Sequence, residues 1–169
     1  VMSDDDFYFA PDWDYYLLEE IKKLDHEYFC ITGTMIEHSH TQYPTSILAP
    51  YNFGKTVKEF DEAKFLKEFQ AIPFHDWTGG NWYPLVLHKN IWALIGGLST
   101  EFTPGMASDP DMMMKLWQCG VRHYKGVSQS RVYHFGSKST ARVKKNDGNK
   151  QFLLKWGFSK STLFEYYLR

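Results

Sequence analysis

Three consecutive aspartates near the start of the chain, Asp4, Asp5 and Asp6, place the strongest constraint on how it can fold. They follow a short apolar segment that is typical of the end of a buried strand. Adjacent carboxylates repel one another, so holding them together costs free energy unless a cation or hydrogen-bond donors compensate. Mg²⁺ or Mn²⁺ would suit, because both prefer oxygen ligands and share their shell with substrate phosphates. An acidic turn, or an N-cap cluster for a helix after Pro11, is the alternative.

Length and charge exclude several classes of protein. The 169 residues fit a single domain, and 19 Lys+Arg against 20 Asp+Glu give a net charge of −1, so no long-range field attracts nucleic acid or anionic lipid. Two cysteines, Cys30 and Cys119, exclude a disulfide-rich scaffold and suit a reducing compartment, which predicts a cytoplasmic location. The longest apolar run, 91–98, is too short for a transmembrane segment, and the acidic start does not resemble a signal peptide.

Periodicity and turn signals predict alternating helices and strands, and therefore an α/β protein with one domain over 1–169. We expect a mobile basic loop at 136–150 and a helical tail at 151–169. The expected helices cover 11–25, 61–70, 90–95, 108–119 and 159–168, and the expected strands cover 28–34, 84–87, 121–127 and 130–135. Aromatic residues make up 18% of the chain, enough to serve both a core and the binding of flat ligands such as sugar rings.

Four segments, in this order along the chain, carry a resemblance to one family. They are Ser3–Phe7 with Pro11 and Trp13, then Trp82–Phe102 with Trp92 and the pair Gly96–Gly97, then Ser108–Asp111, and finally Val132–Phe135. Together they resemble the DxD strand end, the central glycine segment, the acidic helix start and the terminal metal-binding strand of family 2 glycosyltransferases with the GT-A fold. Ser108 departs from the pattern, since the family usually has Glu there.

The resemblance implies the C-terminal, metal- and acceptor-binding part of a GT-A-like mixed sheet flanked by helices. In the family, the strands that hold the nucleotide base precede the DxD motif, so the resemblance predicts that those strands are lacking here. The implied reaction is metal-dependent, inverting transfer of a sugar from a nucleotide-diphosphate sugar to an acceptor hydroxyl. A chain without those strands is expected to bind the donor poorly, to have little or no activity alone and to self-associate through an exposed sheet edge.

The resemblance also assigns roles to individual residues. It makes Asp6, Asp4 and His134 the ligands of Mn²⁺ or Mg²⁺, and Asp109 the general base, with Asp111 in reserve. The helix start should lower the pKa of Asp109. The predicted donor-binding residues are Asp4, Asp5, Gly96, Gly97, Lys138 and Arg142, and the predicted acceptor-binding residues are Trp77, Trp82 and Tyr83.

Simpler interpretations of the same residues stay open. Asp109 can serve the helix start alone, Gly96 and Gly97 can simply end a helix, and the aromatic residues can be core. At the level of the whole protein, the alternatives are a non-catalytic carbohydrate-binding module, an inactive transferase relic or a metal-dependent phosphohydrolase. Mn²⁺-dependent binding of a nucleoside diphosphate would separate a transferase from a carbohydrate-binding module. No motif supports nucleic-acid binding.

Overall fold

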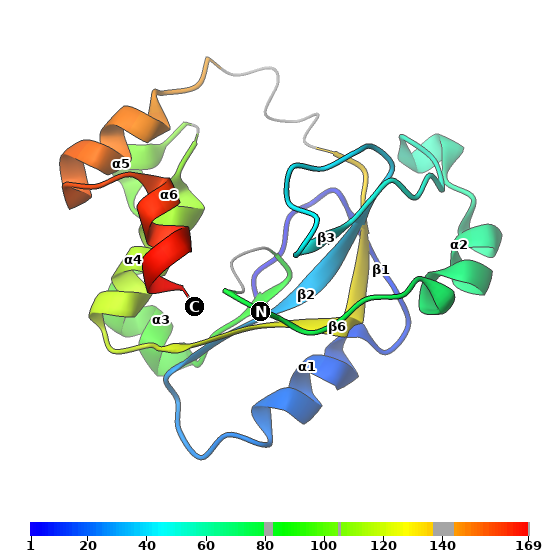
Figure 1. The fold of residues 1–169 in the computed structure, drawn as a ribbon, viewed down its shortest axis with the longest axis horizontal. Coiled ribbons are helices and arrows are strands. Elements are labelled where there is room, and N and C mark those ends of the chain that lie inside the picture. Colours follow the sequence, from blue (N-terminus) through cyan, green and yellow to red (C-terminus); the bar gives the residue numbers. More distant parts are fainter. Residues whose placement is uncertain (80–82, 105, 137–143, 169) are drawn as a thin grey trace.

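The computed structural model is a mixed α/β protein in which helices flank a curled mixed sheet (Figure 1). It describes residues 1–79, 83–104, 106–136 and 144–168. The elements are β1 (Phe7–Phe9), α1 (Trp13–Ile21), β2 (Phe29–Glu37), β3 (Ile47–Leu48), η1 (Val57–Glu59), α2 (Glu62–Glu68), η2 (Phe69–Ala71), β4 (Trp77–Thr78), β5 (Leu85–Val86), α3 (Lys89–Ile95), η3 (Thr100–Phe102), α4 (Ser108–Gln118), β6 (His123–His134), α5 (Gly148–Trp156), α6 (Lys160–Thr162) and the π-helical η5 (Leu163–Tyr167).

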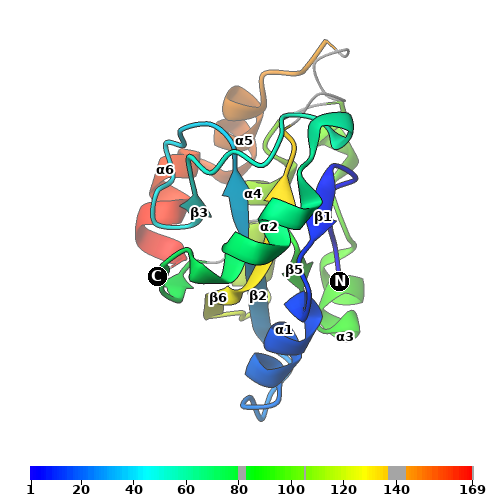
Figure 2. The ribbon, with the colours of Figure 1, turned by 90° about the vertical axis from the view of Figure 1, so that its right-hand side faces the viewer.

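The centre of the sheet is the parallel pair of its two long strands, β2 and β6. Phe29 pairs with His123 at one end and Glu37 with His134 at the other, with a shift of register between Thr32 and Thr34. The outer edge of β6 binds the antiparallel strands β1 and β4, while β2 binds β3 in parallel and β5 in antiparallel. Figure 2 shows β1 and β3 on opposite sides of this central pair.

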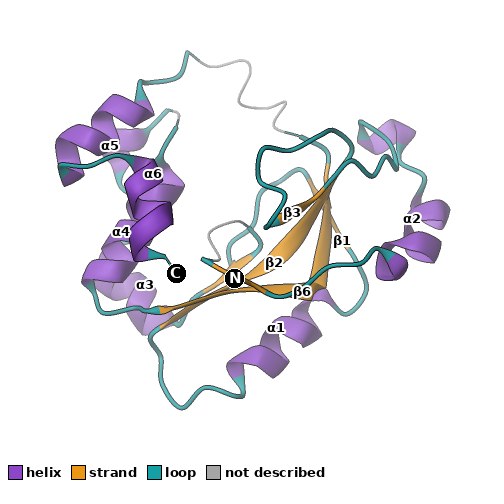
Figure 3. Cartoon of the chain, viewed as in Figure 1, coloured by secondary structure: helices purple, strands orange, loops and turns teal. Residues whose placement is uncertain are grey.

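Separate helices cover separate parts of the sheet, as Figure 3 shows. On α1, Leu17 packs with Phe29, Ile31 and Val127, which the sheet contributes. Beside α2 lies an aromatic cluster around Phe65 and Tyr133. The largest cluster joins α3, α4, α5 and η5 and is centred on buried residues that include Met112, Met113, Leu116, Phe152 and Leu163.

The structure confirms each expected helix and most expected strands, and it corrects several boundaries. Asp61 caps α2 by accepting a hydrogen bond from the Lys64 amide, as its place before the helix predicts. Instead of two strand pieces, β6 is continuous from His123 to His134, and β2 extends to Glu37. Helix α5 begins at Gly148, inside the span expected to be a loop, because Asp147 caps it through the Lys150 amide.

Other expectations about the whole fold concern the GT-A arrangement, self-association and membrane spans. The GT-A-like arrangement itself, and self-association through a sheet edge, remain predictions. Among the residues that the structure describes, no helix is long and apolar enough to cross a membrane.

Candidate functional site

The pairing of β1 with β6 brings the N-terminal aspartates to the end of the central strand. Phe7 lies opposite His134, and the Phe135 amide donates to the Asp6 carbonyl at 3.1 Å. As a result, Asp6 Oδ2 lies 3.4 Å from His134 Nε2. These two residues are 128 positions apart in the sequence (134 − 6), so the sheet alone brings them together.

A second carboxylate, on the helical side of the molecule, acts on the charge of Asp4. Asp109 lies in the first turn of α4, where its Oδ1 accepts a hydrogen bond of 3.2 Å from the Tyr83 hydroxyl. The charges of Asp109, Asp6 and His134 all act on Asp4. We call Asp4, Asp6, Asp109 and His134 the acid cluster.

The acid cluster has unusual electrostatics, and burial is the first cause for each shifted group. Although Asp4 keeps exposed surface, surrounding protein and then the charges of Asp109 and Asp6 raise its pKa to about 6. Burial also raises the pKa of Asp109, against hydrogen bonds from Tyr83 and Ser108 that lower it. For His134, burial lowers the imidazole pKa, but the hydrogen bond to Glu37 and the charge of Asp6 outweigh it, so the net shift is upward.

The raised pKa of Asp109 corrects the expectation that its place at the helix start would lower it. The N-cap of α4 is Ala107, in the left-handed region at φ 78°, and not Asp109, which lies within the first turn. Desolvation of the carboxylate therefore dominates over the field of the helix terminus. A carboxylate with a raised pKa is a stronger base, which favours the role that the resemblance implies.

Glu37 is a member of the site that the sequence did not reveal. Its Oε1 lies 2.7 Å from His134 Nδ1, on the other side of the ring from Asp6. The residue belongs to a polar stretch without a motif, and its partner is 97 positions away. Only strand register connects the two, because Glu37 and His134 are directly opposite each other in the β2–β6 ladder.

Asp6 and His134 have the chemistry of a divalent-metal site. Within the described residues, no group of three or more His, Cys, Asp or Glu side chains is arranged to hold a metal ion. Mn²⁺ and Mg²⁺ often take only one or two protein side chains and complete their shell with water and substrate phosphates, so a pair of ligands fits such a cation. Asp4 lies within the electrostatic reach of both residues, since Asp6 raises its pKa and His134 lowers it.

Asp111, the reserve candidate for the base, is fully buried and makes structural contacts with both carboxylate oxygens. Oδ1 lies 2.8 Å from Lys155 Nζ and accepts from Trp156 Nε1 at 2.9 Å. Oδ2 accepts from the Ser99 hydroxyl at 2.5 Å. These contacts join α4 to α5. Of the two candidate bases, Asp109 and Asp111, only Asp109 is therefore included in the acid cluster.

The structure describes four of the six predicted donor-binding residues, Asp4, Asp5, Gly96 and Gly97. Gly96 and Gly97 have positive φ values of 70° and 68° and end α3, the simpler of the two interpretations of this pair. Asp5 lines a cavity of about 280 Å³ together with Asp6, Lys55, Thr56, Val57, Phe135 and Gly136. Lys138 and Arg142 lie outside the described residues.

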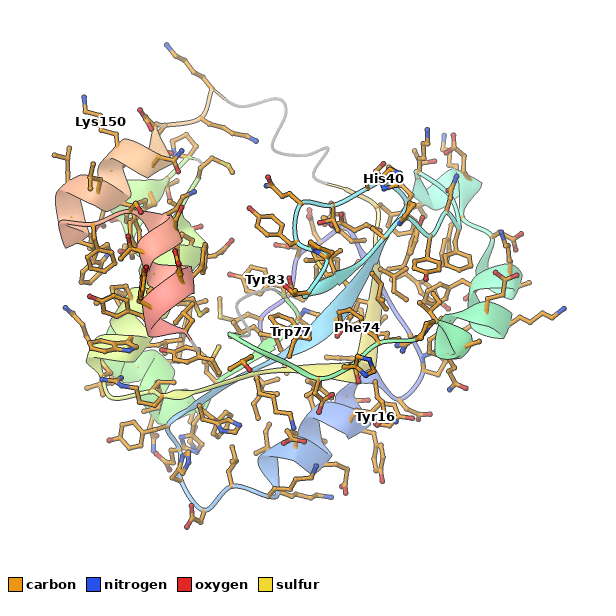
Figure 4. All side chains as sticks on the ribbon, viewed as in Figure 1. Tyr16, His40, Phe74, Trp77, Tyr83 and Lys150 are labelled. Carbon is orange, nitrogen blue, oxygen red and sulfur yellow. The ribbon has the colours of Figure 1, made fainter. Side chains whose placement is uncertain are left out.

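Among the predicted acceptor-binding residues, Tyr83 alone is known to contact the acid cluster. Trp82 lies outside the described residues. Trp77 packs so closely on Gly126 that a methyl group there would overlap the ring, and its indole nitrogen donates to Thr34 Oγ1 at 3.4 Å. Figure 4 shows Trp77 at the sheet, where it belongs to β4, and Tyr83 on the side of the strands that faces helices α3–α6. Trp77 also lines a cavity of about 190 Å³ with Tyr43, Thr45, Ser46, Thr78, Gly79, Phe164 and Leu168.

Comparisons with protein-family models, with curated proteins and with solved structures gave no match.

Proposed function

We propose that this protein is a metal-dependent glycosyltransferase that transfers a sugar, with inversion, from a nucleoside-diphosphate sugar to an acceptor hydroxyl. One observation carries the proposal. The sheet pairs a carboxylate with an imidazole, Asp6 with His134, and the half-buried carboxylate of Asp109 at the start of α4 acts with both on the charge of Asp4. Transfer from a diphosphate needs both parts, a cation site for the leaving group and a base for the acceptor.

On the donor side, Asp6 and His134 would hold Mn²⁺ or Mg²⁺, with Asp4 as a third contributor. When bound, the cation supplies positive charge that stabilises the departing diphosphate. Lys55, which lines the cavity beside Asp5 and Asp6, would add a positive charge on that side. Lys138 and Arg142 remain predicted donor-binding residues outside the described residues.

On the acceptor side, Asp109 would remove the proton of the attacking hydroxyl. Its raised pKa makes it a stronger base than an ordinary aspartate, and the Tyr83 hydroxyl fixes one of its oxygens at 3.2 Å. Trp77 and Tyr83 would provide aromatic surface for a sugar acceptor.

The proposal is tested by measuring release of nucleoside diphosphate from a panel of nucleotide sugars by the full chain, with and without Mn²⁺. We expect Mn²⁺-dependent binding of a nucleoside diphosphate and slow release even with water as acceptor. Asp6→Ala should abolish both. Asp109→Asn should keep binding within about twofold and reduce turnover by at least a hundredfold, the scale of a lost general base.

The alternative classes of protein would give different results in these binding and release assays. A carbohydrate-binding module would bind glycans without metal or nucleotide, and a phosphohydrolase would release phosphate from simple esters. Equal loss of nucleotide affinity in Asp6→Ala and Asp109→Asn would contradict the division of roles. Glu62→Gln is a matched control, since that carboxylate accepts from Tyr8 at 2.6 Å and is not a member of the acid cluster.

A further inference from the structure

The His134 ring has a carboxylate at each of its two nitrogens. Glu37 Oε1 lies 2.7 Å from Nδ1, the length of a strong charge-assisted hydrogen bond. Asp6 Oδ2 lies 3.4 Å from Nε2, beyond the usual range of such a bond. The two sides of the ring are therefore not equivalent.

The short contact determines which nitrogen carries the proton of the neutral ring. A carboxylate can only accept a hydrogen bond, so the Glu37 contact favours a proton on Nδ1. The lone pair of the neutral ring is then on Nε2, the nitrogen that faces Asp6. This is the form of imidazole that can bind a metal through Nε2.

The longer of the two contacts, between His134 Nε2 and Asp6 Oδ2, has the spacing expected for two ligands of one cation. Ligands about 2.1 Å from an octahedral ion and at right angles to each other are roughly 3 Å apart. The separation of 3.4 Å between Nε2 and Oδ2 is close to that value. Metal-binding histidines commonly donate their other ring nitrogen to a carboxylate, which orients the ring and raises its basicity.

We propose that Glu37 is a positioning residue that holds His134 in the Nδ1–H tautomer and directs Nε2 at a divalent cation shared with Asp6. The inference rests on the proposed metal-dependent function. It adds to that function a residue from β2, so that the cation site is formed by both central strands and by the segment before β1. Glu37 itself touches neither cation nor substrate.

The first test needs no metal and no substrate. Two-bond ¹H–¹⁵N correlation spectra of the labelled metal-free protein at alkaline pH distinguish the two tautomers of a neutral imidazole. Comparison with His134→Gln identifies its signals among the seven histidines. We expect the Nδ1–H pattern in the native protein, the same pattern in Glu37→Gln, whose amide oxygen still accepts, and a mixture in Glu37→Leu. A predominant Nε2–H pattern in the native protein would overturn the inference.

The second test is Mn²⁺ affinity, measured by electron paramagnetic resonance of the free ion. Loss of a carboxylate behind a metal-binding histidine weakens binding about 10–100-fold, so we expect this for Glu37→Leu and a smaller loss for Glu37→Gln. Glu62→Gln should bind Mn²⁺ like the native protein. Unchanged affinity in Glu37→Leu would overturn the role of Glu37 alone, whereas a native protein that does not bind Mn²⁺ would overturn the metal-dependent function.

Discussion

The carboxyl group of Asp4 gives the acid cluster a measurable pH dependence. Its pKa is raised to about 6, so the folded protein keeps this proton at pH values where the unfolded chain has lost it. The unfolded state then binds fewer protons, and the free energy of unfolding falls as pH rises from the unfolded pKa to about 6. This contribution is fully present below the unfolded pKa and is lost above the folded one.

We therefore expect the metal-free protein to lose stability relative to Asp4→Asn as pH rises through this window. Urea unfolding at a series of pH values measures the difference. Asp14→Asn, at an exposed position on α1, is the control and should follow the native curve. Two parallel curves for the native protein and Asp4→Asn would show that the pKa of Asp4 is ordinary.

The hydroxyl of Tyr83 should influence how kcat/KM falls at low pH, because it hydrogen-bonds to the proposed base Asp109. Its hydrogen bond lowers the pKa of Asp109, so Tyr83→Phe should raise that pKa further. A base with a higher pKa becomes active at higher pH, and the acid limb of kcat/KM should move upward. Tyr8→Phe, whose hydroxyl bonds to Glu62, should leave the profile in place. A downward move in Tyr83→Phe would contradict the assignment.

Residue types and motif order selected Asp6 and His134, which lie 3.4 Å apart, together with Asp4 and Asp109, whose charges interact. The environment of each was not predictable. The place of Asp109 at a helix start indicates a lowered pKa, but the protein packed around this half-buried carboxylate desolvates it and raises the pKa instead.

At the scale of elements, the contact between α4 and α5 depends on a buried ion pair. Lys155 is the cation beside the fully buried Asp111, and removing one partner of such a pair typically costs about 3–5 kcal/mol. Lys155→Met should lower the free energy of unfolding by roughly 3 kcal/mol, because Asp111 keeps only neutral donors. Calorimetry or urea unfolding measures the loss.

Two variants separate this buried pair from exposed charges nearby. Glu101→Gln removes the more exposed partner of Lys155 and should cost under about 1 kcal/mol. Lys150→Met, at an exposed position of α5, should cost a similarly small amount. If all three variants were equally stable, the pair would not hold α5 to α4.

Some element boundaries follow from a local signal, although the cap at Asp147 shows that such a signal can be overlooked in a basic, polar stretch. Asp61 and Gly157 mark a helix start and a helix end through their own chemistry. Residues 127–130 carry no such signal. They interrupt the alternation of β6, which favours two strands by sequence, but pairing with β2 on either side keeps the strand continuous.

At the scale of the whole molecule, the central β2–β6 pair contains two buried threonines, only one of which has a hydrogen-bond partner for its hydroxyl among the described residues. Thr32 Oγ1 is buried without a hydrogen-bond partner among the described residues. Thr34 Oγ1 donates to the Val127 carbonyl at 3.0 Å and accepts from Trp77. An unpaired buried hydroxyl costs about 1–3 kcal/mol, so Thr32→Val should stabilise the protein by roughly 1 kcal/mol and Thr34→Val should destabilise it by a similar amount. Urea unfolding of both variants tests the opposite signs, and a destabilised Thr32→Val would show that its hydroxyl is satisfied.

The shift of register in the same pair has a consequence for changes in chain length. Between the pairs Thr32–Gly126 and Thr34–Arg131, β2 advances two residues while β6 advances five. The β6 strand therefore has three extra residues here, which form a bulge. An insertion or deletion among these extra residues changes the bulge alone, and the β2–β6 pairs on either side can keep their partners. Beyond the bulge, at 131–134, the loss of a single residue would turn the His134 ring to the opposite face of the sheet, away from both Glu37 and Asp6.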